Sequence, residues 1–184
     1  MSKPSIVAPG GSLDKALIAL HYGADAVYVG SQKFSLRKSA NNLTFNELRY
    51  LCCVAHQLSK RVYLALNIFP HERDVASIKS FLNEISDIPL DACIVSDLGM
   101  AVLIRDHTPF TIHASTQASI MNSHSAQLWA NLGAKRVVLA REASLSEALK
   151  IKNNTGLEIE QFIHGAMCSS FSGKCTISNV ASGR

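Results

Sequence analysis

Residues 5–30 read SIVAPGGSLDKALIALHYGADAVYVG and contain one complete strand–helix–strand pattern. The segment begins and ends with short apolar runs, which are typical of strands that are covered on both faces. Between these runs, Leu13, Leu17 and Leu20 have the spacing of residues on one face of a helix. Gly23 follows them, and we expect it to end the helix with a positive φ and turn the chain into the next strand. The segment therefore predicts a parallel βαβ unit.

The same alternation continues along the rest of the chain. We expect strands at residues 5–8, 26–29, 62–68, 92–95, 111–114, 136–140 and 158–163, with helices between them. Two capping boxes, Thr44 with Glu47 and Ser144 with Glu147, predict where two of the helices begin. No GxGxxG motif follows the first strand, which disfavours a dinucleotide-binding Rossmann domain. The sequence therefore predicts an α/β fold: a TIM-like (β/α) barrel of about seven strands that is incomplete at its C-terminus.

The composition is that of one soluble globular domain covering residues 1–184, with 47% hydrophobic and 17% charged residues. We expect no membrane span, because no apolar run is long enough, and no signal peptide, so the expected location is the cytoplasm. Five irregularly placed cysteines also favour a reducing compartment over a disulfide framework. The net charge of +4 is compatible with an RNA partner, but the basic residues form no continuous stripe.

Polar residues follow the predicted strands at the ends where a (β/α) barrel carries its functional groups. The residues that we expect to be catalytic are His113, Gln117, Glu142 and His164. Those that we expect to bind a small anionic substrate are Arg37, Asn67, Asp97 and Arg141.

Several of these residues also have a purely structural interpretation. His113 and His164 are alternatively core histidines, and Arg141 with Glu142 is alternatively an ion pair at the barrel mouth. Asp97 is alternatively the N-cap of a helix that begins at Leu98. Three further cysteines are interpreted as core residues: Cys52, Cys53 and Cys93.

Cys168 and Cys175 differ from the other cysteines, because they lie in a polar, glycine- and serine-rich stretch after the last predicted strand. Thiolates in such a loop suit zinc or an iron–sulfur cluster. Their spacing is not the CxxC spacing of a zinc ribbon, and the sequence offers no convincing third or fourth thiolate. The pair therefore predicts half of a four-ligand site.

The same region resembles the collagenase-like peptidase family U-32. Residues 160–178 follow the pattern E-x-F-x-x-G-A-M-C-x-x-x-x-G-x-C-x-I-S, which is similar to the signature of that family. Further similar stretches occur in order along the chain: APGGSLDKALIALHYGADAVYVG, FSLRKSANN, LNIFPHE, IVSDLGM, HASTQAS and VVLARE.

The resemblance implies a barrel-like catalytic domain and, by the family name, a peptidase. It also implies a second activity, because other members are oxygen-independent hydroxylation factors that act on tRNA, ribosomal RNA or ubiquinone precursors. Such members carry a 4Fe-4S cluster on four cysteines, and the RNA-acting ones use prephenate as the source of the hydroxyl group. By this resemblance, Cys168 and Cys175 are the first two cluster ligands, and the other two are expected beyond residue 184. The chain is thus expected to be the N-terminal barrel of an RNA hydroxylation factor, truncated after the cysteine signature.

Two alternatives remain open. A cysteine peptidase needs a thiolate beside a histidine base, and His164 lies four residues before Cys168, but neither a nucleophile elbow nor an HExxH motif is present. The other alternative is an inactive fragment or binding module. An incomplete barrel also has exposed strand edges, so a homo-oligomer is a further expectation.

Overall fold

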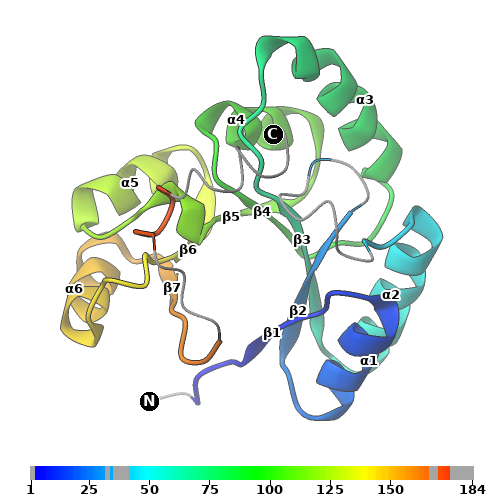
Figure 1. Ribbon diagram of the computed structural model, residues 1–184, viewed down its shortest axis with the longest axis horizontal. Helices are drawn as coiled ribbons and strands as arrows, with labels where there is room; N and C mark the ends of the chain where they lie inside the picture. Colours follow the sequence, from blue (N-terminus) through cyan, green and yellow to red (C-terminus); the bar gives the residue numbers. More distant parts are fainter. Residues whose placement is uncertain (1–2, 32–33, 35–41, 166–169, 175–184) are drawn as a thin grey trace. The chain divides into compact units, whose positions relative to one another are not determined.

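The computed structural model describes residues 3–31, 34, 42–165 and 170–174 of the chain. Strands and helices alternate, and the strand order in the sheet follows the sequence from β1 to β7 (Figure 1). The pairs β1–β2, β2–β3, β3–β4 and β6–β7 are parallel. The predicted α/β class, with seven strands in the order of a TIM-like barrel, is therefore confirmed. The chain divides into two compact units, residues 1–112 and 113–184, which are described separately below.

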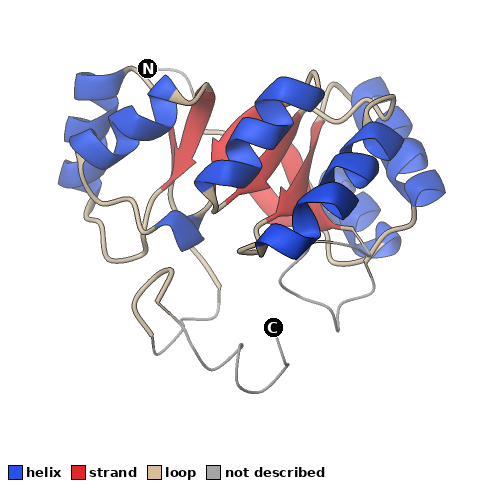
Figure 2. Cartoon of the chain, turned by 90° about the horizontal axis from the view of Figure 1, so that it is seen from above, coloured by secondary structure: helices blue, strands red, loops and turns tan. Residues whose placement is uncertain are grey.

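The described residues of the first unit form four complete strands and four α-helices. Its elements are β1 (Val7–Pro9), α1 (Leu13–His21), β2 (Ala26–Gly30), α2 (Phe45–Gln57), β3 (Arg61–Leu66), η1 (Glu72–Asp74), α3 (Val75–Ile85), β4 (Ala92–Val95) and α4 (Leu98–His107). Helices α1 and α2 contact each other and pack on β2 and β3, while α4 contacts β4. Figure 2 distinguishes these helices, in blue, from the strands, in red.

Local sequence explains where these helices begin and how they pack. The hydroxyl of Thr44 accepts a hydrogen bond from the Glu47 backbone N–H, and the Glu47 carboxylate accepts from the Thr44 backbone, as the capping box predicts. In α1, Leu20 is buried and Leu13 is half-buried, so the predicted apolar face does meet the sheet. Gly10 allows this contact, because a Cβ at that position would overlap the side chain of Val29.

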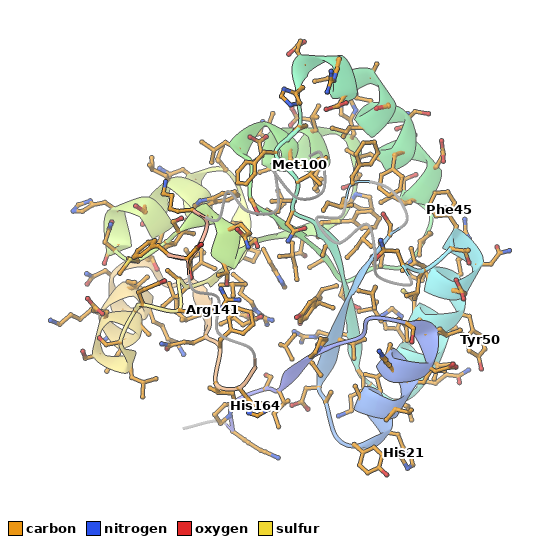
Figure 3. All side chains as sticks on the ribbon, in the orientation of Figure 1. His21, Phe45, Tyr50, Met100, Arg141 and His164 are labelled. Atoms are coloured by element: carbon orange, nitrogen blue, oxygen red, sulfur yellow. The ribbon has the colours of Figure 1, made fainter. Side chains whose placement is uncertain are left out.

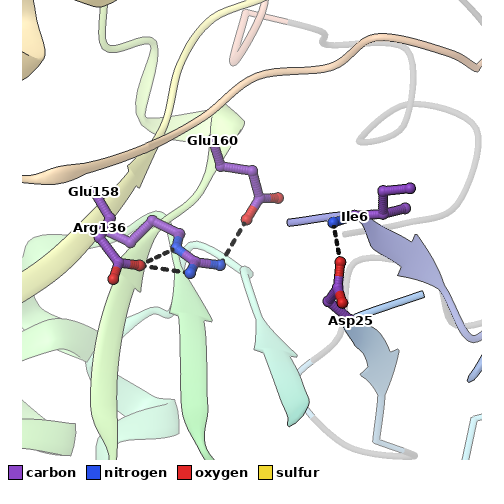
Figure 4. Close-up of polar contacts among 5 residues, drawn as sticks. All are labelled: Ile6, Asp25, Arg136, Glu158 and Glu160. Atoms are coloured by element: carbon purple, nitrogen blue, oxygen red, sulfur yellow. Dashed lines mark hydrogen bonds and ion pairs between the residues drawn. The ribbon is translucent and has the colours of Figure 1, made fainter. Parts of the chain in front are cut away.

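Asp25 connects the first two strands. Its Oδ2 accepts a hydrogen bond from the Ile6 backbone N–H at 2.8 Å (Figure 4). Its Oδ1 lies 3.3 Å from the Lys60 ammonium. The hydrogen bond from Ile6, followed by that from Lys60, lowers the pKa of this carboxyl below its usual value. Asp25 therefore stays ionised at neutral pH and holds the start of β1 beside β2.

The interpretation of the three other cysteines is correct for two of them. Cys52 and Cys93 are fully buried, and burial raises the pKa of the Cys52 thiol to about 12. Cys53, in contrast, is exposed, so its interpretation as a core residue is wrong. The two residues are adjacent on α2, where a rotation of about 100° per residue turns one side chain inward and the next one outward.

The second unit begins within β5 (Thr111–Ala114) and continues with η2 (Thr116–Ala118), α5 (Ser123–Asn131), β6 (Ala134–Val138), α6 (Leu145–Thr155) and β7 (Glu158–Glu160). The two helices contact each other, and α5 packs on β6 while α6 packs on β7. The second predicted capping box is present at Ser144 and Glu147. Gly133, like Gly23 in the first unit, has a positive φ before a strand, as expected.

Arg136 provides the charged centre of the β6–β7 pair (Figure 4). Its side chain is 9% exposed, and its guanidinium contacts the Glu158 carboxylate and, at 3.3 Å, the Glu160 carboxylate. Burial raises the pKa of Glu160, and the charge of Arg136 opposes that shift. The strand pairing places the three residues together, because Arg136 pairs with Glu158 and Val138 pairs with Glu160.

Two strand predictions in this unit need correction. Strand β7 ends at Glu160 instead of residue 163, because Gln161 turns away to donate a hydrogen bond to the Ala143 carbonyl and Ile163 is 90% exposed. Strand β6 begins and ends two residues earlier than predicted, at Ala134 and Val138. None of the helices in the described part of the chain is long and apolar enough to cross a membrane.

Candidate functional site

The strand ends of the first unit carry Asn67 and Asp97. Asn67 directly follows β3, and its side chain is half-buried. Asp97 follows β4, and its Oδ1 accepts a hydrogen bond of 2.8 Å from the Met100 backbone N–H. The structural interpretation of Asp97 as the N-cap of α4 is thus confirmed. Substrate binding by either residue stays a prediction.

Ser96 is an additional polar residue at the end of β4. It is 6% exposed, and its hydroxyl has no hydrogen-bond partner among the residues that the structure describes. A buried hydroxyl without a hydrogen-bond partner costs free energy of folding, and this hydroxyl lies directly before the residue that caps α4. From the sequence alone, a single serine after a strand gives no signal that separates it from an ordinary loop residue.

In the second unit, β5 and η2 position His113 and Gln117. His113 lies in β5 and is 4% exposed, as its alternative interpretation as a core histidine requires. Gln117 lies in η2 and is half-buried, and its backbone N–H donates to the Ser115 hydroxyl that caps this turn. His164, on the loop after β7, is exposed, so it is not a core histidine (Figure 3).

Arg141 and Glu142 follow β6, and each has its own partner. The guanidinium of Arg141 lies 4.6 Å from the centre of the Phe162 ring, which is a cation–π contact. The Glu142 carboxylate accepts a hydrogen bond of 3.0 Å from the Ser172 backbone N–H. Within the described part of the chain, no salt bridge joins Arg141 to Glu142, so the ion-pair alternative is not supported by the structure.

The pKa of Glu142 lies below its usual value. Desolvation raises this pKa. Hydrogen bonds from the backbone and side chain of Ser172, together with the nearby charge of Arg141, lower it by more than desolvation raises it. Glu142 is therefore an ionised hydrogen-bond acceptor at neutral pH. A general acid needs the opposite property, namely a carboxyl that keeps its proton near neutral pH.

Ser172 connects the loop that follows β5 and η2 with the loop that follows β6, and sequence reasoning did not identify it. Its hydroxyl accepts from the Arg141 backbone N–H at 3.1 Å, and its carbonyl accepts from the Ser119 hydroxyl at 2.6 Å. Together with the bond to Glu142, these contacts bury Ser172 to 2% exposure. The only sequence signal for this role was its place one residue before the glycine of the G-x-C motif.

Three predicted site residues, Arg37, Cys168 and Cys175, lie outside the described residues. Within the part of the chain that is described, no three His, Cys, Asp or Glu side chains lie close enough to hold a metal ion. The buried Cys52 and Cys93 are also poor ligands, because burial raises the pKa of both thiols. Cys168 and Cys175 stay the predicted thiolate ligands, and two thiolates are half the set that an iron–sulfur cluster uses.

Comparison with known proteins identifies several relatives. The chain is 39% identical over 183 residues to tRNA hydroxylation protein P1 of Bacillus subtilis, covering 99% of this chain and 43% of that protein. It is 34% identical to the 23S rRNA 5-hydroxycytidine C2501 synthase of Escherichia coli, covering 97% of this chain and 27% of that enzyme. It is also 31% identical to a collagenase of Porphyromonas gingivalis, covering 94% of this chain and 44% of that protein. The chain thus spans less than half the length of these curated relatives.

The fold comparison agrees with these sequence matches. A solved U32 peptidase structure, Mk0906, is similar with a TM-score of 0.72 at 15% identity, over 88% of this chain and 69% of that one. Residues 11–184 match the family described as peptidase family U32, which is nearly the whole chain. The resemblance noted from the sequence motifs is therefore confirmed, and the chain belongs to peptidase family U32.

Proposed function

We propose that this chain is the N-terminal barrel portion of a tRNA hydroxylation protein. The observation that carries the proposal is its 39% identity to tRNA hydroxylation protein P1, which extends over 99% of the chain. The similarity to an rRNA hydroxycytidine synthase supports RNA as the class of substrate. The net charge of +4 is compatible with a polyanionic partner. Action on tRNA also favours a cytoplasmic location.

The strand-end residues have distinct roles in this proposal. In the second unit, Arg141 binds a small anionic co-substrate such as prephenate, because guanidinium groups pair with carboxylates in a bidentate manner, and His113 and Gln117 orient that molecule. In the first unit, the proposed substrate-binding residues are Arg37, Asn67 and Asp97. His164 lies on an exposed loop, where a bound substrate can reach its ring.

The proposed cofactor is a 4Fe-4S cluster. Cys168 and Cys175 would supply two of its thiolate ligands, and residues outside this sequence would supply the others. The cluster would provide the electron-transfer chemistry that hydroxylation without oxygen needs, while the residues named above bind and orient the substrate. Self-association of the chain through a strand edge is a further proposal.

A peptidase is the second candidate function, and the collagenase relative at 31% identity is the observation that favours it. In that alternative His164 is the base, and it is exposed, while the nucleophile Cys168 lies outside the described residues. An inactive binding module is the third candidate, because Cys168 and Cys175 account for two of the four thiolates that a 4Fe-4S cluster needs.

The decisive experiment uses this chain and a version extended through the two further cysteines that the family resemblance implies, both purified without oxygen. We expect the longer protein to contain iron and sulfide near four each per chain and to restore the hydroxylated tRNA nucleoside in a bacterial strain that lacks it. Mass spectrometry of digested tRNA detects the product as a nucleoside heavier by one oxygen atom. Cys168→Ser is expected to lose both iron and product, while Cys53→Ser, at an exposed cysteine on α2, is the matched control.

Each alternative predicts a different result. Cleavage of gelatin by a protein that contains no iron would support the peptidase and contradict the hydroxylation proposal. A longer protein that binds neither iron nor sulfide and leaves the tRNA unmodified would support the inactive binding module.

A further inference from the structure

A tight turn at residues 171–174 lies between the two cysteines of the signature. The Lys174 backbone N–H donates a hydrogen bond of 2.9 Å to the Phe171 carbonyl, which closes the turn. Gly173, its third residue, has a φ of 80°, and a type II turn requires a positive φ at that position. Phe171 is 45% exposed, but Ser172 is 2% exposed, so the turn is held by its second residue.

Ser172 is held by three residues from two separate loops. Its backbone N–H donates to Glu142, its hydroxyl accepts from the Arg141 backbone, and its carbonyl accepts from the Ser119 hydroxyl. Each polar group of Ser172 therefore has a partner, as a buried residue requires. These contacts come from the loops after β5 and β6, which are parts of the same compact unit as the turn.

Gly173 allows the turn to approach this closely. A Cβ on Gly173 would overlap both the Ser119 hydroxyl oxygen and the Gln117 carbonyl oxygen. The second of these atoms belongs to the backbone, so it cannot move aside as the end of a flexible side chain can. The close approach to Ser119 and Gln117 and the positive φ each require glycine at position 173. This is a physical reason for the glycine in the G-x-C part of the signature.

We propose that Ser119, Arg141 and Glu142 form a docking seat for the turn at residues 171–174, and that this seat positions the segment that carries Cys168 and Cys175. Glu142 is then a positioning residue that acts through Ser172. The turn begins three residues after Cys168 and ends one residue before Cys175.

The docking is tested by amide hydrogen exchange of the peptide that covers residues 170–174, in protein without RNA or metal. We expect Glu142→Ala to speed exchange at Ser172 about fivefold, since it removes one hydrogen-bond acceptor. Glu142→Gln keeps an acceptor oxygen and should exchange like the unaltered protein. Gly173→Ala should speed exchange throughout the turn and expose the bond after Lys174 to trypsin.

Gly156→Ala is the matched control for Gly173→Ala. Gly156 ends α6 with a φ of 70°, but a Cβ there would meet nothing within 4 Å. Gly156→Ala therefore introduces a similar backbone strain without an overlap of the new Cβ with other atoms. Amide hydrogen exchange at residues 170–174 should not change in this variant. Equal exchange in Glu142→Ala, Gly173→Ala and the unaltered protein would overturn the docking seat.

The link to the cysteines rests on the proposed function, and it has its own readout. In the longer protein purified without oxygen, Glu142→Ala should lower the iron content per chain, and Glu142→Gln should preserve it. Unchanged iron in a Glu142→Ala protein with fast exchange would refute the positioning role and leave the docking intact. An unaltered protein with slow exchange at Ser172 but no iron and no tRNA product would instead overturn the proposed function alone.

Discussion

Replacing Arg136 by methionine tests whether its guanidinium stabilises the largely buried Glu160 carboxylate in the β6–β7 pair. The substitution leaves the Glu160 side chain, which is 19% exposed, without the cation beside it. Removing one partner of a buried ion pair typically costs 3–5 kcal/mol, because the remaining charge is desolvated without compensation. Glu158 is 61% exposed and contributes little to this cost, so we expect a loss of about 3 kcal/mol in the free energy of unfolding at neutral pH.

The loss should depend on pH with a definite sign. Burial raises the pKa of Glu160 above its ordinary value of 4.5. The folded state therefore favours the protonated carboxyl, and the contribution of this group to stability falls as the pH rises from the unfolded pKa through the folded pKa. Without Arg136 the folded pKa rises further, so this fall becomes larger and extends to higher pH. The variant should thus be less impaired near pH 4.5 than near pH 7.

Urea denaturation at the two pH values measures both effects, and a loss of about 3 kcal/mol corresponds to a decrease in Tm of about 6–12 °C. The control is the double variant Arg136→Met with Glu160→Gln, which also removes the buried charge and should recover part of the lost stability. An equal loss at both pH values, or no recovery in the double variant, would refute the reasoning.

Three further substitutions test single features of the fold and the candidate site. Asp97→Ala should lower the free energy of unfolding by about 1 kcal/mol in urea denaturation through loss of the α4 cap, while Asp97→Asn keeps the cap. If Asp97 also binds substrate through its charge, Asp97→Asn loses tRNA product at unchanged stability; normal product would leave capping as its role. Gly10→Ala should lower the Tm, with a loss of about 1–3 kcal/mol from overlap with Val29, whereas Gly23→Ala, with no atom near the new Cβ, should cost only the strain of its positive φ. Thr44→Ala should cost about 1 kcal/mol, Thr44→Ser should cost little, and equal thermal stability of the two would contradict the capping box at α2.

The alternation of strands and helices was predictable because its causes are local. The capping residues Thr44 and Ser144 each bond to a residue three positions away, so the sequence itself contains both partners. The apolar face of α1 is likewise a matter of spacing within one helix. Family membership was also predictable, since the signature residues occur in order along the chain.

Strand ends and individual burial were less predictable. Ile163 is as apolar as a strand residue, yet it is 90% exposed, because the chain leaves the sheet after Glu160. Hydrophobic periodicity reports which residues prefer burial, but the neighbouring elements decide how much sheet is available to bury them. The same limit explains Cys53, which is exposed although the cysteine beside it is buried.

The sequence by itself determined the βα alternation, the helix caps, the parallel strand order and the family. Only the tertiary structure decided that Glu142 holds Ser172, and that Ser119 and Arg141 complete the same seat. These partners lie 30, 53 and 31 positions from Ser172, so no local pattern relates them. The physical reason is that a hydrogen bond of this kind depends on where two loops meet after the strands have paired, and strand pairing is a property of the whole folded unit.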